Sequence, residues 1–164
     1  MNKQWLKNKD NSYTFFVDNT ETGLITFTSN SNIKTGSFVI GQNHFTINKK
    51  GFWSSTLLIT GNSGEEVAKM YAEKWYANNW VLEYAGKKYK ISVRNNPLAE
   101  YVIVDTGKEI LSYGLDADKG KVQVKITGIA DQTDFLFDFL LWYLFAPVAA
   151  ENMGDNLDFI LLTA

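Results

Sequence analysis

Few side chains in this sequence of 164 residues could carry chemistry. His44 is its single histidine and there is no cysteine, which excludes a thiolate nucleophile, a disulfide and a multi-histidine metal site. A Ser–His–Asp triad needs a serine and an orienting acid within reach of the histidine. Nothing in the spacing around "GQNHFTI" favours one. We interpret His44 as a surface residue beside a turn, and we predict a protein that is not an enzyme and needs no cofactor.

Three carboxylates fall at positions i, i+3 and i+7, where they would share one face of a helix: Asp131, Asp134 and Asp138. One interpretation is an oxygen-ligand metal site or an acid–base pair. The interpretation we favour is that Asp131 and Asp134 cap the start of the helix, while Asp138 finds a partner within the protein. Arg94, the single arginine, is one candidate for that partner. A lysine, a tyrosine or a backbone donor would serve equally well.

Two clusters of basic side chains could bind anions. The first is the pair Lys49–Lys50, and the second comprises Lys87, Lys88, Lys90 and Arg94. In a strand, Lys88, Lys90 and Arg94 would point to one face, with Lys87 opposite. If the two clusters meet in space, they form a patch for anionic lipid head groups. Solvated strand edges that discourage aggregation would explain the same lysines.

The overall composition favours a β-rich globular protein with no general affinity for nucleic acid. The net charge is −2, aromatic residues make up 15%, and there are 12 glycines and 2 prolines, which suits strands joined by tight turns. Without a basic excess, a nucleic-acid stacking platform is disfavoured. We therefore expect the five tryptophans and eight tyrosines to build an aromatic core. The expected partners are an anionic phospholipid surface or another protein.

The elements that would position these residues are mostly strands. From Ser12 to Thr127, short runs rich in aromatic and β-branched residues alternate with turn signals such as "TETG", "GQN" and "DADKG". The stretch "GEEVAKMYAEKWYA" has an alternative interpretation as a short helix. About twelve mostly antiparallel strands are predicted, and because an open sheet of that size would curl or split, we predict a closed barrel. Residues 1–164 would form this single domain.

One segment, "DFLFDFLLWYLFAPVAAE", is apolar on all sides and predicts a helix over about residues 132–150. The run from Phe135 to Ala150 would span about 24 Å, short of the roughly 30 Å hydrocarbon core of a bilayer. It contains Asp138, and no basic residue follows Lys125. These features favour a helix buried along the barrel axis over a membrane anchor. The final "LDFILLTA", Leu157–Ala164, would then be a closing strand.

This order of elements resembles that of tubby C-terminal-like domains, above all the phospholipid scramblase and LURP-one-related types. The stretch "FTINKKGFWSSTLLITGNSGEEVAKMYAEKW" is similar to their repeated strand, turn and "V-A-x-V" pattern, and the apolar segment is similar to their core helix. The resemblance implies a barrel around a central helix and a role at membrane lipids. The cysteine-rich segment of the scramblases has no counterpart here, because the chain has no cysteine.

The leading functional hypothesis is a non-enzymatic binding or scaffold domain that docks on anionic membrane lipids or on a protein partner. The candidate head-group residues are those of the two basic clusters. One alternative is a lipocalin-like carrier with a small apolar ligand inside the barrel, and another is a tail-anchored membrane protein. The N-terminal residues show no apolar secretory segment, so we expect a cytoplasmic location, peripheral to a membrane if lipid is bound.

Overall fold

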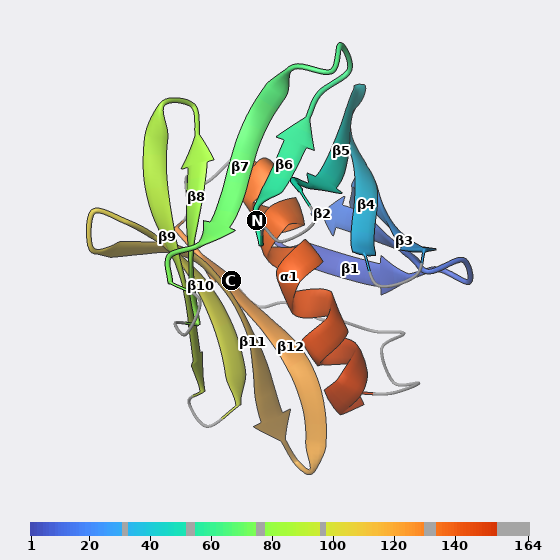
Figure 1. Ribbon diagram of the computed structural model, residues 1–164. Coiled ribbons are helices and arrows are strands. Elements are labelled where there is room, and N and C mark those ends of the chain that lie inside the picture. Colours follow the sequence, from blue (N-terminus) through green and yellow to red (C-terminus); the bar gives the residue numbers. More distant parts are fainter. Residues whose placement is uncertain (31–32, 52–54, 75–77, 96–97, 130–133, 154–164) are drawn as a thin grey trace.

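The computed structural model describes residues 1–30, 33–51, 55–74, 78–95, 98–129 and 134–153 (Figure 1). Its strands are β1 (Lys3–Lys7), β2 (Ser12–Val17), β3 (Thr20–Asn30), β4 (Ile33–Ile40), β5 (Asn43–Lys49), β6 (Leu57–Thr60), β7 (Glu66–Ala72), β8 (Asn79–Tyr84), β9 (Lys87–Asn95), β10 (Ala99–Asp105), β11 (Lys108–Asp118) and β12 (Lys121–Gly128). One helix follows, α1 (Leu136–Met153). The prediction of a mainly β fold with about twelve strands and a C-terminal helix is confirmed.

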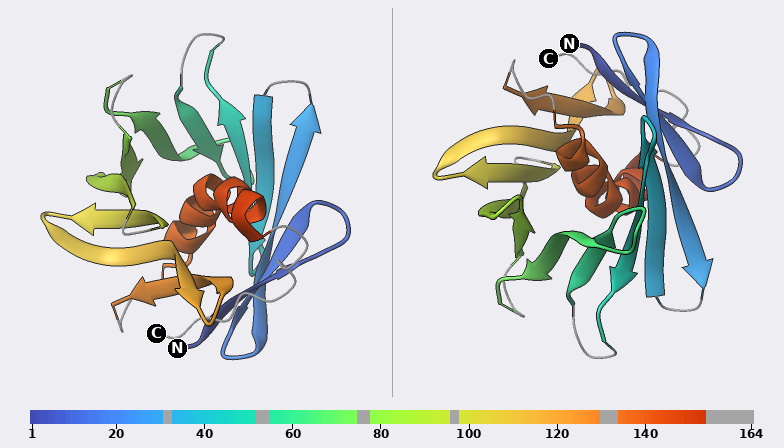
Figure 2. Two further views of the ribbon diagram at one scale, coloured as in Figure 1. Left: turned by 90° about the horizontal axis from the view of Figure 1, so that it is seen from below. Right: turned by 90° about the horizontal axis from the view of Figure 1, so that it is seen from above.

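The strands form one antiparallel meander in which each pairs with the next, in the order β1 to β12. The sheet curls into a nearly closed barrel around α1 (Figure 2). In the part of the chain that the structure describes, β1 and β12 are the two edges of the sheet and do not pair with each other. The predicted closing strand, Leu157–Ala164, lies outside the described residues.

Two-residue turns close several of the hairpins. In four of them both central residues have positive φ, as type I′ turns require: Asp18–Asn19, Ala85–Gly86, Thr106–Gly107 and Lys119–Gly120. These turns correct two predictions. The "TETG" stretch belongs to β3, because the turn falls at Asp18–Asn19, and β11 runs on to Asp118 through most of "DADKG".

Two further boundaries differ from the sequence predictions. Strand β1 lies before Ser12, where the predicted strands begin. In the stretch "GEEVAKMYAEKWYA", for which a helix was the alternative, residues Glu66–Ala72 form β7. Helix α1 begins at Leu136 rather than near residue 132, and it continues past Pro147 to Met153. Proline prevents the helical hydrogen bond at its own nitrogen but does not always end a helix.

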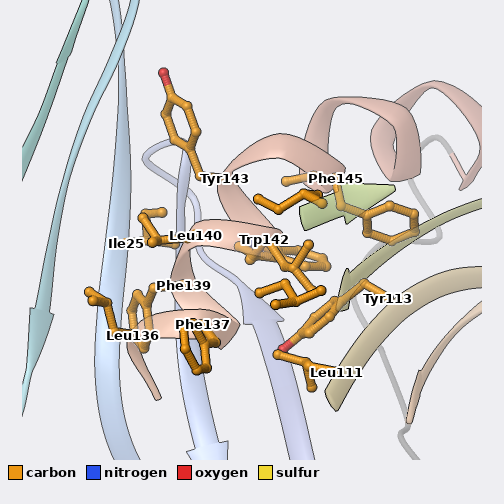
Figure 3. Close-up of a cluster of buried hydrophobic side chains, with 14 of the residues drawn as sticks. Ile25, Leu111, Tyr113, Leu136, Phe137, Phe139, Leu140, Trp142, Tyr143 and Phe145 are labelled. Atoms are coloured by element: carbon orange, nitrogen blue, oxygen red, sulfur yellow. The ribbon is translucent and has the colours of Figure 1, made fainter. Parts of the chain in front are cut away.

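The core is an aromatic cluster between α1 and the sheet (Figure 3). Trp142 is fully buried, and its ring stacks on Trp5 of β1 at 5.0 Å between centroids. Phe139, one turn earlier, packs against Phe15 of β2 and Phe38 of β4. Burying aromatic side chains of this size dominates core energetics. The prediction that the apolar segment is the inside of a barrel is therefore confirmed.

Helix and sheet approach so closely at Gly23 of β3 that no larger side chain fits. A Cβ atom there would clash with the backbone oxygen of Val39 in β4 and would lie 2.7 Å from the ring of Phe139. Glycine at this position lets the Phe139 ring press against the backbone of the sheet.

Candidate functional site

Asp138 is the charged group buried deepest among the described residues, and its partner is Lys3 of β1. Its carboxylate is fully buried, and Lys3 is 8% exposed. The Lys3 ammonium donates to Asp138 Oδ2 at 2.8 Å and to Oδ1 at 3.0 Å. Burial raises the pKa of Asp138, although Lys3 and Tyr113 act in the opposite direction. The structure thus confirms a partner inside the barrel for Asp138.

Two aromatic side chains complete this group. The Tyr113 hydroxyl of β11 donates to Asp138 Oδ1 at 2.8 Å and accepts from Trp5 Nε1 at 3.0 Å. Tyr113 is fully buried, and burial raises the pKa of its hydroxyl well above the usual value of 10.0. An amine, a carboxyl group and a phenol that stays protonated therefore meet in the buried core. We call Lys3, Tyr113 and Asp138 the buried triad.

The candidate pairing of Asp138 with Arg94 is wrong. Arg94 of β9 donates to Glu100 at 2.7 Å and to Glu109 at 2.6 Å, on the outside of the barrel. The pair with Glu109 joins β9 to β11, so the Arg94 side chain must cross the outer face of β10. The hydrogen bond to Glu100 is the largest cause that raises the pKa of Arg94, and the hydrogen bond to Glu109 is the second. Arg94 is thus paired with two carboxylates on the outer face, and its part in head-group binding stays a prediction.

The other two carboxylates of the predicted helical face, Asp131 and Asp134, do not join Asp138 in one site among the described residues. Asp134 acts as the helix cap, because its side chain accepts from the backbone N–H of Leu136 at 3.1 Å. Burial and a hydrogen bond to Asp134 raise the pKa of Tyr84, at the end of β8, to about 12. Asp131 lies outside the described residues. Asp134 and Asp138 thus have separate structural partners.

The two lysine clusters lie at opposite ends of the barrel. We call the end with the β8–β9 turn the upper end and the opposite one the lower end (Figure 1). Lys49 ends β5 and pairs with Leu57 at the lower end, whereas Lys87 opens β9 opposite Tyr84 at the upper end. The four lysines Lys49, Lys50, Lys87 and Lys90 are all exposed. The clusters therefore do not form one combined patch, and head-group binding by either stays a prediction.

Within the upper cluster, Lys88 belongs to a small network. Its ammonium lies 3.3 Å from Glu83 Oε1, which also accepts from the Tyr71 hydroxyl at 2.9 Å. The hydrogen bond to Glu83 raises the pKa of Lys88, while that from Tyr71 lowers the pKa of Glu83. Carboxylates line the groove beside this cluster, because Glu66 and Glu83 stand next to Lys87 and Lys88. This mixture of charges favours a solvated surface.

Around the second half of α1, the lower end of the barrel contains a pocket of about 570 Å³. We call it the mouth pocket. Its walls are mainly apolar and come from both the sheet and the helix: Phe27, Leu57 and Trp80 on one side, and Tyr143, Leu144, Pro147 and Val148 on the other. Lys49, Ser55 and Glu151 add its polar groups. The Phe27 and Tyr143 rings stack at 5.7 Å and form one side of the floor.

The mouth pocket was not predicted from the sequence, although Lys49 was singled out. Its walls come from β3, β5, β6, β8 and α1. These elements are far apart in the sequence, so the sequence does not show that Trp80 and Val148 border the same space. The alternative of a lipocalin-like carrier placed the ligand at the centre of the barrel, where α1 lies in the structure (Figure 2). Apolar space open to a ligand is instead found at the end of the helix.

His44 takes no part in either site. It is exposed near the β4–β5 turn, where its backbone N–H donates to Asn62 Oδ1 at 2.8 Å. The interpretation as a surface residue is confirmed.

Comparisons with protein-family models, with curated proteins and with solved structures find no match for this chain. The resemblance to tubby-like domains therefore stays a prediction. Among the described residues, no helix has the length and apolar character needed to cross a bilayer.

Proposed function

We propose that this protein is a non-enzymatic binding domain that docks on anionic membrane lipids through the mouth pocket. The observation that carries the proposal is the combination of an apolar pocket of about 570 Å³ with Lys49 at its edge. Lys50 follows directly and is also exposed. A lipid presents the matching chemistry, an anionic head group next to apolar glycerol and acyl carbons.

The local structure holds Lys49 and Lys50 in place beside the pocket. Lys49 pairs with Leu57 in the β5–β6 ladder, and the backbone N–H of Lys50 donates to Thr56 O at 2.8 Å. Their ammonium groups therefore extend from an anchored backbone at the lower end. Each lysine near an anionic membrane surface contributes about 1 kcal/mol to binding.

The aromatic wall of the pocket suits the interfacial part of a bilayer. Trp80 and Tyr143 combine an apolar ring with a polar group, the composition that favours the head-group region of membranes. Trp80 is half-buried, so part of its ring can still lose contact with water on binding. Glu151 is the opposing feature, since its exposed carboxylate would repel an anionic head group at the same pocket.

The test is co-sedimentation with vesicles of phosphatidylcholine alone or mixed with phosphatidylserine, at low and at moderate salt. We expect binding to the anionic vesicles that weakens with salt. Lys49→Glu/Lys50→Glu should lower the partition coefficient more than about tenfold. The matched control, Lys87→Glu/Lys90→Glu, makes the same change in charge at the upper end and should retain most of the binding.

A second variant separates the pocket from the lysines. Leu144→Asp places a carboxylate in the apolar wall without removing a cation, so it should also weaken vesicle binding. Three results would contradict the proposal: no binding to either kind of vesicle, equal binding to neutral and anionic vesicles, or equal loss in the upper-end control. The first would direct attention to a protein partner, and the second to a small apolar ligand.

A further inference from the structure

The buried triad has the composition and geometry of a covalent reaction that lipid binding does not use. Lys3 Nζ lies 2.8 Å from one oxygen of Asp138 and 3.0 Å from the other. A nitrogen in contact with both oxygens must lie close to the carbon Cγ that carries them, and a small shift of Nζ from the carboxylate plane to its face brings it into line for attack on Cγ. The residues come from β1 and α1, at opposite ends of the chain, and both are fixed by the surrounding core.

We propose that Lys3 and Asp138 condense into an isopeptide bond that joins β1 covalently to α1. The Nζ–Cγ bond forms, the Cγ–Oδ1 bond of Asp138 breaks, and Oδ1 leaves as water. The ammonium and carboxylate together hold three protons, all on Nζ. Two of them leave with Oδ1 and one stays on the amide nitrogen, so the reaction needs no oxidant, reductant or other reactant.

The surroundings favour the amide over the ion pair. Asp138 is fully buried and Lys3 nearly so, and an ion pair in such a place carries a large desolvation cost that a neutral amide does not. The reactive forms are the neutral amine and the neutral acid, which a proton shift from Nζ to the carboxylate produces. Burial raises the pKa of Asp138 and so makes its neutral form more accessible.

Tyr113 is placed to act as the acid that assists this step. Its hydroxyl touches Oδ1 at 2.8 Å, and it is held by the Trp5 indole N–H at 3.0 Å. Because burial raises its pKa well above 10.0, the phenol keeps its proton. It can therefore stabilise the negative charge that grows on Oδ1 when Nζ attacks. Tyr113 regains its original state at the end of the step.

The bond would have a clear structural effect. Among the strands that the structure describes, β1 is one of the two edges of the sheet, and an edge strand separates more easily than an inner one. An isopeptide bond between residues 3 and 138 would hold this edge on the central helix even when the remaining hydrogen bonds of β1 open.

Intact-mass spectrometry of the purified, untreated protein tests the proposal. The wild type should be lighter than its sequence mass by one water molecule, whereas Lys3→Arg, which keeps the positive charge but lacks the reactive amine, should have its full mass. The last basic residue is Lys125, and trypsin does not cut after a linked lysine. A digest should therefore contain residues 1–7 joined to residues 126–164.

A folded wild-type protein that keeps its full sequence mass after prolonged incubation would overturn the proposal, and so would a linked peptide that excludes Lys3 or Asp138. Tyr113→Phe removes only the assisting hydroxyl. Loss of one donor of this kind slows a reaction ~10²-fold or more, which can be followed as the linked fraction at successive times after induction of expression. Linkage at the wild-type rate in Tyr113→Phe would show that the hydroxyl has no part in the step.

Discussion

The two halves of α1 meet the barrel in different ways. In the first half, Phe139 and Trp142 are fully enclosed by sheet residues, and Asp138 is bound to Lys3 and Tyr113. In the second half, Pro147 and Val148 are half-buried and line the mouth pocket. One helix therefore completes the core at its start and leaves space at its end. The second half thus combines core residues such as Phe145 and Ala149 with residues that line the mouth pocket.

The sizes of the side chains along α1 explain why its start is enclosed and why its end borders a pocket. Large aromatic side chains are concentrated before residue 146, and they fill the space between the helix and the sheet. After residue 146 the side chains are smaller, with Pro147, Val148 and two alanines before Glu151. These smaller side chains leave a pocket between them and the rings of Phe27 and Trp80.

Truncation of the enclosed half should have the largest effect. Trp142→Ala leaves a cavity in the core and should lower the free energy of unfolding by about 3–5 kcal/mol, measured by chemical denaturation. Val148→Ala, in the wall of the mouth pocket, should cost clearly less. Trp142→Phe is the matched control, because the indole N–H of Trp142 has no hydrogen-bond partner among the described residues. Equal costs for Trp142→Ala and Val148→Ala would remove the contrast between the two halves.

Breaking the buried triad should cost nearly as much. Asp138→Leu removes the carboxylate that the buried Lys3 ammonium contacts, and loss of one partner of a buried ion pair typically costs about 3–5 kcal/mol. The double variant Lys3→Met/Asp138→Leu replaces both charges with apolar groups and should be more stable than Asp138→Leu, which equally lacks the proposed bond between residues 3 and 138. The comparison is made by urea denaturation of the three proteins. If the double variant is no more stable than Asp138→Leu, the loss does not come from the ammonium of Lys3.

A smaller loss is expected where helix and sheet approach most closely. Gly23→Ala introduces a Cβ atom that would meet the backbone oxygen of Val39 and the ring of Phe139. The resulting shift should cost about 1–3 kcal/mol, which thermal unfolding can detect. Thr22→Ala, at the neighbouring and partly exposed position, is the control. A neutral Gly23→Ala would mean that both the β4 backbone at Val39 and the helix at Phe139 can shift without loss.

The smallest effect concerns the link between the helix cap and β8. Because burial and the hydrogen bond to Asp134 raise the pKa of Tyr84 to about 12, the folded state holds this proton more tightly than the unfolded state does. The stabilisation from Tyr84 is therefore complete below the unfolded pKa of 10.0 and is lost as pH rises towards 12. Over this range the wild type should lose more stability than Tyr84→Phe. Parallel stability–pH curves for the two proteins would contradict this.

Much of the fold could be predicted from the sequence because strand and helix patterns are local. The apolar run around Trp142 contains a carboxylate and lacks a basic flank, which was enough to favour a buried helix. Strand β1 was missed because "KQWLK" is short and its lysines look like a polar surface, although the alternation places Lys3 on the same face as the buried Trp5.

The candidate site was harder to predict because it depends on which residues meet across the barrel. The choice of Arg94 for Asp138 rested on the scarcity of arginine. Yet the strand alternation puts Arg94 on the same face as Lys88 and Lys90. A face that carries exposed lysines is the outer one, so Arg94 cannot reach an internal carboxylate. The mouth pocket depends on side chains from five elements, and no local pattern contains that information.

The most direct test of the contrast between the two halves is ¹⁹F NMR of fluorotryptophan-labelled protein, titrated with a short-chain phosphatidylserine. Resonances would be assigned with single Trp→Phe variants. We predict that the Trp80 resonance, at the mouth pocket, shifts with lipid concentration while those of Trp5 and Trp142 do not. No change at Trp80, or equal changes at all three, would contradict the assignment of binding to the lower end and of the core to the first half of the helix.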